Sequence, residues 1–259
     1  QLLTQNPILA TALNNFLDPI RDRRDEFDSR PGYVERVIYE DKRLIVVDKP
    51  SGVAVHGGSG ISHGVVELLR HARPELRDLS LVHRLDRETS GCLVLAKRRS
   101  ALRELHARFR EGQVEKNYLA LVVGDWQLGE QVIDAPLLVE HRKGGERHVV
   151  VSRGGKPAQT RAQLSRTFGR YSLLQCEPMT GRTHQIRVHL ASENLPVVGD
   201  PVYGRRGAAR AALRLPLLIE SLSIPVDGDT AIIGLMARHR VWEGTMWGQP
   251  YGSPVESWL

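Results

Sequence analysis

Cysteine is scarce in this chain: only two residues, Cys92 and Cys176, occur among 259. Thiols so few and so far apart exclude a disulfide scaffold and a cysteine-rich zinc site. Both lie among apolar and β-branched residues, where a free cysteine is usually a buried, unreactive thiol. This usage fits the reducing environment of the cytoplasm.

Long apolar runs are also lacking. No stretch approaches the ~20 residues that a membrane-spanning helix needs, although 41% of the residues are hydrophobic. The first residue is Gln1 rather than Met, and residues 1–15 lack the basic start, apolar centre and cleavage site of a signal peptide. We therefore expect a soluble cytoplasmic protein with no membrane partner, and the absence of heptads gives no reason to expect more than a monomer.

Positive charge is in excess, with 36 lysines and arginines against 30 acidic residues and a net charge of +6. An excess of this size indicates a polyanionic partner, nucleic acid first and an anionic membrane surface second. The alternative is an ordinary solvated basic surface. Charge alone does not decide between these interpretations.

Short β-branched runs separated by turn residues dominate the pattern from Val34 onward. Val37–Tyr39 and Leu44–Val47 predict a hairpin, and helical spacing follows Ser62, Ala101 and Arg182. We expect an α+β domain built on a mixed, mainly antiparallel central sheet with flanking helices. Further strands are expected at residues 79–82, 92–96, 118–123, 131–139, 148–151, 160–165 and 171–176.

Asp86 stands between two arginines, Arg84 and Arg87. In an extended segment Arg84 and Asp86 share one face, and a neighbouring guanidinium keeps a carboxylate ionised, as a nucleophile or base requires. Spacing alone favours a simpler interpretation, an ion pair that braces a loop. A glycosidase is a poor alternative because no second acid stands beside Asp86.

A second polar cluster spans Gly181–His189. Arg182 and Thr183 occupy the expected start of a helix, where backbone N–H groups favour anions, and His184 and Arg187 project together three residues apart. The two histidines have the wrong spacing for a zinc site and lack a third ligand, so we expect no metal. An RNA-facing basic helix and a solvated helix both fit.

Tyr118 begins a predicted strand. A half-buried strand aromatic is the common structural interpretation. The functional interpretation has the ring stack on a nucleobase or the phenol accept a proton.

Several strings of the sequence, taken in order, resemble the RluA-type pseudouridine synthases across residues 34–204. Within that family, residues 55–60 and 96–106 are most similar to the large ribosomal subunit type C. The strings are Asp48–Gly52, His83–Gly91, Lys116–Ala120, Gly181–His189 and Gly199–Gly204.

The resemblance implies an enzyme that isomerises uridine in structured RNA, most simply large-subunit ribosomal RNA or otherwise transfer RNA, with no cofactor. Asp86 would start cleavage of the glycosidic bond of a flipped-out uridine. Arg84 would occupy the space that the base leaves, Tyr118 would stack on uracil and assist removal of the C5 proton, and Arg187 would pair with Asp86. The remaining expected substrate-binding residues are Arg87, Arg182, Thr183, His184 and Gln185.

Two departures from the family pattern bear on activity. The polar lead-in 1–32 is too short for the S4 RNA-binding domain of many relatives, so we expect the catalytic domain at 33–215. After it the family has an apolar strand that lines the pocket, and here Pro216 would interrupt that strand. The segment 216–259 therefore diverges, and a non-catalytic RNA-binding relative is the alternative to an enzyme.

Overall fold

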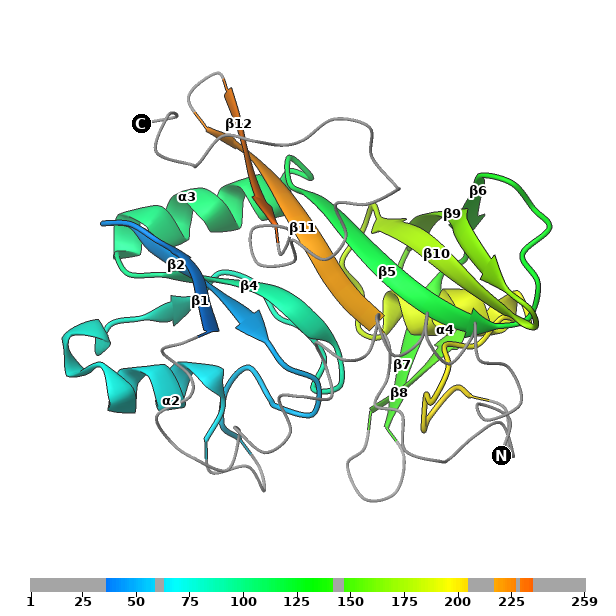
Figure 1. The fold of residues 1–259 in the computed structure, drawn as a ribbon, viewed down its shortest axis with the longest axis horizontal. Helices are drawn as coiled ribbons and strands as arrows, with labels where there is room; N and C mark the ends of the chain where they lie inside the picture. The colour runs from blue at the N-terminus through cyan, green and yellow to red at the C-terminus, as the bar shows by residue number, and fades with distance from the viewer. Residues whose placement is uncertain (1–35, 59–62, 142–146, 205–216, 227–228, 235–259) are drawn as a thin grey trace.

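The computed structural model describes residues 36–58, 63–141, 147–204, 217–226 and 229–234 (Figure 1). The expected lead-in 1–32 and most of the segment 216–259 lie outside these residues. The described chain has the expected α+β architecture, with strands in the majority. Its helices are α2 (Val65–Ala72), the short 3₁₀ helix η3 (Pro74–Leu76), α3 (Arg99–Arg110) and α4 (Gln185–Ser192).

The strands form one large sheet and one separate hairpin. The hairpin pairs β7 (Leu137–His141) with β8 (Arg147–Val151). The large sheet contains β1 (Val37–Glu40), β2 (Leu44–Lys49), β3 (Ser80–Leu81), β4 (Ser90–Ala96), β5 (Glu115–Val123), β6 (Gln131–Asp134), β9 (Gln159–Phe168), β10 (Tyr171–Pro178), β11 (Leu217–Val226) and β12 (Asp229–Gly234).

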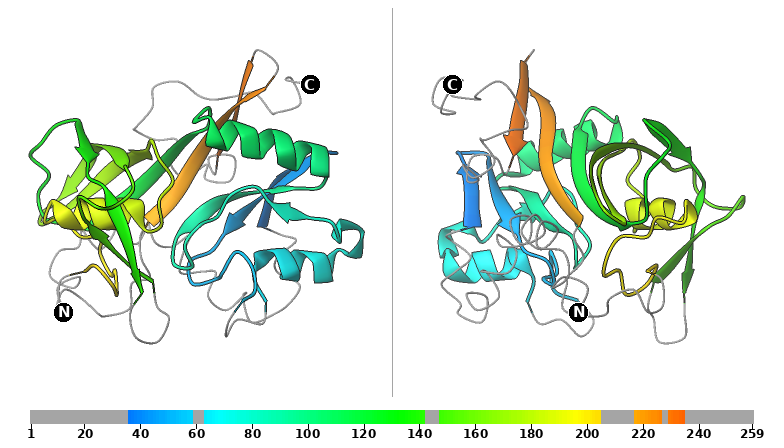
Figure 2. Two further views of the ribbon diagram at one scale, coloured as in Figure 1. Left: turned by 180° about the vertical axis from the view of Figure 1, so that it is seen from behind. Right: turned by 45° about the vertical axis from the view of Figure 1, so that its right-hand side comes forward.

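The main path through the large sheet runs β1-β2-β4-β11-β5-β10-β9-β6, with β3 on β4 and β12 on β11. Every pairing is antiparallel except that of β4 with β11, so the sheet is mixed and mainly antiparallel as expected. Helices α3 and α2 lie above and below the β1-β2-β4 part in both Figure 1 and Figure 2. Helix α4 packs against β8, β9 and β10. Among the described residues, no helix combines the length and the apolar character of a membrane span.

Apolar side chains on the two halves of the sheet form separate buried clusters. Val46 and Leu93 join Leu69 of α2 and Leu105 of α3 in the first cluster. The second cluster gathers β5, β10 and α4 residues. Tyr118 is half-buried and packs against both clusters. The junction of the two clusters is therefore where the predicted catalytic tyrosine lies.

Most expected elements are present, and two have different bounds. The run 131–139 is not one strand, because Ala135 and Pro136 separate β6 in the large sheet from β7 in the hairpin. Helix α4 begins at Gln185 rather than Arg182, since His184 before it adopts a left-handed backbone with φ of 54°. Arg182 and Thr183 consequently precede the helix instead of forming its first turn.

The expected interruption of a central strand at Pro216 is also wrong. Strand β11 begins at the next residue, Leu217, and lies between β4 and β5. Leu218 pairs with Ser90 of β4 and with Leu119 of β5. Residues 217–226 are thus part of the large sheet, while the division of the chain into domains stays a prediction.

Candidate active site

Asp86 lies in the irregular loop between β3 and β4, and its side chain is 27% exposed. A buried lysine fixes this loop from behind: Lys49, fully buried, donates from Nζ to the carbonyls of Pro50, Val53 and Arg87 at 2.8, 2.8 and 2.9 Å. Burying a charge is costly unless its donors are satisfied. The turn after β2 and the loop that carries Asp86 are therefore joined as one rigid unit.

Two further hydrogen bonds strengthen this junction. The Ser51 hydroxyl donates to the Glu88 carbonyl at 2.7 Å, and the Gly52 N–H donates to the Arg87 carbonyl at 2.9 Å. The Arg87 side chain donates back to the Gly52 carbonyl at 3.0 Å. Asp86 is thus held by contacts on its C-terminal side while its carboxylate stays accessible.

Arg187 on α4 meets Asp86 across 101 residues of sequence. Its Nη1 donates to Asp86 Oδ2 at 3.2 Å. Its Nε and Nη2 form a two-pronged contact with Asp200 at 2.8 and 2.9 Å. Burial alone would lower the pKa of Arg187, but the two carboxylates raise it above its ordinary value. The guanidinium therefore stays charged and provides a cation beside the Asp86 carboxylate.

Asp200 and Tyr203 belong to this site although sequence reasoning gave them no role. Asp200 accepts bonds from Arg187 and from the N–H groups of Val202 and Tyr203. Burial would raise its pKa, yet these contacts bring the pKa below its ordinary value. The Tyr203 ring lies 5.0 Å from the Arg187 guanidinium carbon. Both residues fall within the string Gly199–Gly204, the sequence feature that could have pointed to them.

His184 approaches the same carboxylate, with Nε2 3.9 Å from Asp86 Oδ2. Its Nδ1 is hydrogen-bonded to the Tyr203 hydroxyl at 2.8 Å, and that hydroxyl also accepts the Val149 N–H. A left-handed backbone is uncommon for a residue other than glycine. Here it directs the ring toward Asp86 at the start of α4, so the expected joint projection of His184 and Arg187 is confirmed.

Tyr118 on β5 completes the group. Burial raises the pKa of its hydroxyl, and the negative charge of Asp86 raises it further. The phenol is therefore protonated near neutral pH.

The arginines beside Asp86 in sequence do not pair with it in the described structure. Arg84 is exposed, and Arg87 contacts Gly52 and, at 3.8 Å, Glu88. The expectation that these neighbours are the cations beside Asp86 is wrong, because Arg187 supplies that cation. Their exposure leaves both side chains available to a substrate.

Gln185 is a structural residue, contrary to its predicted contact with substrate. It is 4% exposed. Its amide donates to the Gln159 carbonyl and the Thr160 hydroxyl at 2.8 and 2.9 Å, and its oxygen accepts from Thr180 and Arg182. All its hydrogen-bonding capacity is used within the protein.

The α4 helix as a whole is also not the RNA-facing helix considered above, because Gln185 through Leu190 are all buried. The residues before it differ: Arg182 is exposed and Thr183 is half-buried. Arg182 donates from Nε to the Pro157 carbonyl at 2.9 Å. Within the described residues, no three His, Cys, Asp or Glu side chains are grouped to hold a metal ion.

Known proteins resemble this chain in sequence. The family model of RNA pseudouridylate synthase matches residues 43–192. Over 170 residues the chain is 53% identical to ribosomal large subunit pseudouridine synthase C of Escherichia coli (strain K12) and of Salmonella typhi, covering 66% of this chain and 53% of each relative. The chain thus spans about half the length of these relatives.

Solved structures agree in fold. Human RNA pseudouridylate synthase domain containing 1 superposes with a TM-score of 0.68 at 27% identity, covering 80% of this chain and 84% of that one. Human RNA pseudouridylate synthase domain containing 4 gives 0.66 at 26% identity, covering 79% and 89%. The resemblance seen in the sequence is confirmed, including its type C character, and the chain belongs to the RNA pseudouridylate synthase family.

Proposed function

We propose that this chain isomerises uridine to pseudouridine in RNA, with Asp86 as the catalytic carboxylate. The observation that carries the proposal is the contact of Arg187 with Asp86 at 3.2 Å. The negative charge of Asp86 also raises the pKa of Tyr118. A charged carboxylate, a fixed guanidinium and an aromatic ring together suit chemistry on a sugar and a base.

The chain's own residues divide the work. Asp86 starts cleavage of the N-glycosidic bond, either by adding to C1′ or by taking the 2′ proton, and both routes need it ionised. Uracil then turns and bonds through C5 to C1′, and the C5 proton is lost as N1 regains one. One C–N bond is exchanged for one C–C bond with no net redox change, so we propose that no cofactor takes part.

Tyr118 acts mainly through its ring in this proposal. Its raised pKa makes the phenolate rare at neutral pH, so the side chain stacks on uracil as a protonated phenol. Consumption of the Asp86 charge during the reaction would ease deprotonation. Proton removal from C5 by Tyr118 therefore belongs after the carboxylate has reacted.

The target uridine has to leave its stack to reach Asp86. Arg84, Arg87 and Arg182 are exposed around the site, and we propose that they contact the flipped nucleotide and its neighbours, together with Thr183 and His184. Large-subunit ribosomal RNA is the proposed substrate because the 53% identical relatives are named for it. Transfer RNA is the alternative within the family. We propose further that the protein acts in the cytoplasm as a monomer.

A decayed, RNA-binding relative is disfavoured by β11. The sequence suggested that the C-terminal wall of the pocket is damaged, but β11 pairs with both β4 and β5. This continuity supports an active enzyme.

The test is to incubate the protein with unmodified large-subunit ribosomal RNA and, separately, with unmodified transfer RNA, and to map pseudouridine chemically. We expect product in ribosomal RNA from the wild type and none from Asp86→Asn, with RNA affinity within about twofold of wild type. Asp134→Asn, an exposed carboxylate on β6, is the control and should keep full activity. Equal activity of Asp86→Asn would refute the mechanism, and tight binding without product from the wild type would favour the decayed relative.

A further inference from the structure

Helix α3 carries a line of exposed arginines. Arg99, Arg103 and Arg110 are all exposed and lie at positions i, i+4 and i+11. At 3.6 residues per turn their side chains fall within about 40° of one another around the helix axis. Leu105 on the opposite side is buried in the core. The helix therefore presents one basic stripe to solvent.

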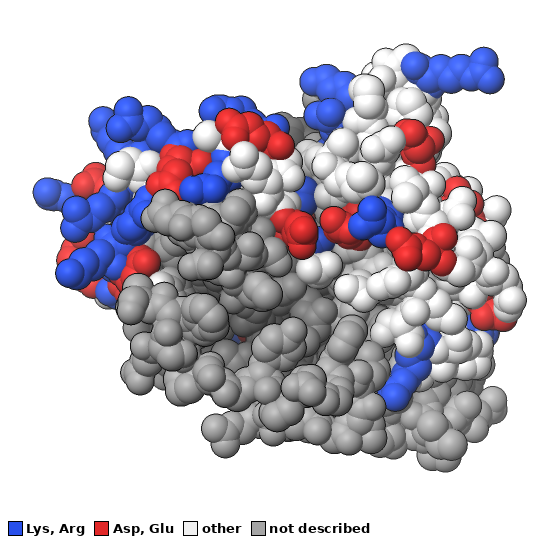
Figure 3. Space-filling view, turned by 90° about the horizontal axis from the view of Figure 1, so that it is seen from above, with Lys and Arg blue, Asp and Glu red and all other residues white. Residues whose placement is uncertain are grey.

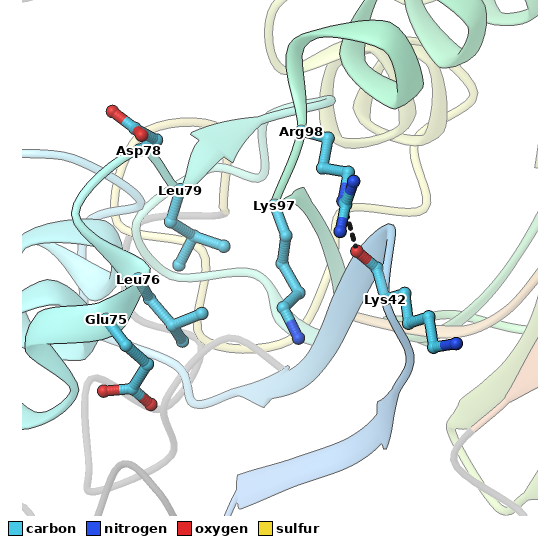
Figure 4. Close-up of a pocket in the computed structure, with 7 residues that line it drawn as sticks. All are labelled: Lys42, Glu75, Leu76, Asp78, Leu79, Lys97 and Arg98. Atoms are coloured by element: carbon cyan, nitrogen blue, oxygen red, sulfur yellow. Dashed lines mark hydrogen bonds between the residues drawn. The ribbon is translucent and has the colours of Figure 1, made fainter.

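The turn between β1 and β2 extends this stripe. Arg98, just before α3, donates from Nε to the Lys42 carbonyl at 3.0 Å, and both residues are exposed (Figure 4). They line a hollow with Leu76 and Leu79. Lys97 also lines it, but its ammonium bonds Glu40 and the Asp41 carbonyl. Glu75 and Asp78 line the hollow as well, and Glu75 pairs with Arg73, so the hollow carries both charges with the basic pair on one side.

Part of the local acidic charge is paired within the protein, although Asp78 and Glu111 are exposed near this surface. Glu104 pairs with both Arg43 and Arg108. In contrast, within the part of the chain that the structure describes, no ion pair is found for five exposed cations. We call these the α3 surface: Lys42, Arg98, Arg99, Arg103 and Arg110. Figure 3 shows the basic side chains gathered on this side of the molecule, with some acidic ones among them.

The start of α3 is separated from the candidate active site. Asp86 comes shortly before the start of β4, and α3 begins three residues after β4 ends. A seven-residue strand spans about 20 Å. A nucleotide bound at Asp86 is therefore out of reach of Arg98 and Arg99. The end of α3 returns toward the Asp86 loop, where Phe109 stacks on His83 with ring centroids 5.2 Å apart.

The chemistry of the α3 surface fits a nucleic-acid backbone better than a membrane or a protein. Membrane-surface helices and protein interfaces present apolar or aromatic side chains. Among the described residues, the exposed large apolar side chains all lie from Leu128 onward, outside this surface. A row of cations without apolar groups is the pattern that binds phosphates.

We propose that the α3 surface binds the phosphate backbone of a second segment of the substrate RNA, with Arg98 and Arg99 about 20 Å from the flipped uridine. The inference rests on the proposed RNA substrate and adds a second contact region. It implies that a large folded RNA binds more tightly than the isolated hairpin that contains the target.

The experiment compares binding of two probes: in vitro transcribed large-subunit ribosomal RNA, and a hairpin cut around the uridine found by chemical mapping. The variant is Arg99→Gln with Arg103→Gln. The control is Arg166→Gln with Arg170→Gln, which removes two exposed arginines at the β9–β10 end of the sheet. Arg99→Lys with Arg103→Lys retains the charge and checks that the helix still folds.

We expect the glutamine variant to bind the long RNA about five- to tenfold more weakly, with the slope of log affinity against log salt reduced by about 1.5. The lysine variant and the β9–β10 control should stay within about twofold. Affinity for the hairpin should match wild type in every variant. Unchanged long-RNA binding and salt slope, or an equal loss on the hairpin, would overturn the proposal. So would binding of anionic phosphatidylserine vesicles that the long RNA does not displace.

The outcomes also separate this inference from the proposed function. If the wild type forms no pseudouridine, the probe becomes the long transcript alone, and the α3 surface is judged by affinity and salt slope. A loss of long-RNA affinity in the glutamine variant alone would support the α3 surface, even though the proposed enzymatic function had been refuted. Full pseudouridine-forming activity of the wild type, together with unchanged long-RNA binding by the glutamine variant, would keep the enzymatic function and overturn the α3 surface.

Discussion

Arg187 contacts two carboxylates, and it does not hold them equally. Asp200 receives two hydrogen bonds at 2.8 and 2.9 Å and has a fully buried side chain, whereas Asp86 receives one at 3.2 Å and is 27% exposed. Asp200 therefore fixes the guanidinium, and Asp86 is oriented by a cation that is already in place. A preorganised charge of this kind needs no rearrangement when the reaction begins.

Asp200→Asn tests this division. The amide can replace one acceptor, but it leaves Arg187 buried with less compensating charge, so we expect a loss of about 2–4 kcal/mol in the free energy of unfolding. We also expect kcat to fall about tenfold or more with little change in KM for RNA, because Asp200 positions Arg187 and does not touch substrate. Chemical denaturation and single-turnover kinetics measure both effects.

The lowered pKa of Asp200 also predicts how the stability difference between wild type and Asp200→Asn changes with pH. The pKa of Asp200 is lower in the folded protein than in the unfolded chain, so its stabilisation is complete above the ordinary carboxyl pKa of about 3.9 and is lost as pH falls through the folded value. The stability gap between wild type and Asp200→Asn should be constant above about pH 5 and shrink below about pH 4. Asp134→Asn, at an exposed site, should show no such gap, and a gap that grew in acid would contradict the assignment.

Single residues show how far the sequence could predict the site. The structure confirms the pairing of Asp86 with Arg187, which the family motifs made predictable. Pattern alone chose Arg84 and Arg87, since neighbours in sequence are all that spacing can see. Gln185 was misassigned for a related reason: a polar residue in a motif can serve the fold, and only its four internal hydrogen bonds reveal this.

Among the elements, β11 joins the two strands that matter most for chemistry. It runs parallel to β4 at Ser90 and Gly91, just after the Asp86 loop, and antiparallel to β5 at Tyr118. The sequence could not predict this placement, because β11 follows a proline and its partners lie about a hundred residues or more away. Hairpins such as β1–β2 were predictable because their partners are adjacent.

Ile219→Pro should break this junction. Strands flank β11 on both sides, so the backbone N–H at this position belongs to a ladder whichever way it points, and proline removes it. We expect a loss of about 3 kcal/mol or more in the free energy of unfolding and a larger relative loss of activity, measured by thermal melting and pseudouridine mapping. Gln131→Pro, at the first residue of the edge strand β6, is the control and should cost much less. Equal effects of the two prolines would argue against a central β11.

At the scale of the whole molecule, the candidate site lies between two cores that share one sheet. The cluster around β2 and β4 fixes the Asp86 loop, and the cluster around β5, β10 and α4 fixes Arg187. Tyr118 packs against both. The catalytic geometry therefore depends on both halves at once, and the continuous sheet makes their unfolding cooperative.

This coupling can be measured with one truncation in each core. Leu93→Ala on β4 and Leu174→Ala on β10 each remove a fully buried side chain, and each should lower the free energy of unfolding by about 2–5 kcal/mol. Because the sheet is shared, each variant should still unfold in a single urea transition, with circular dichroism and pseudouridine-forming activity lost together. Val132→Ala, at an exposed side chain on β6, controls for truncation itself. Two separate transitions, or activity lost well before the circular dichroism signal in only one variant, would mean that the cores fold independently and that the site is assembled by docking them.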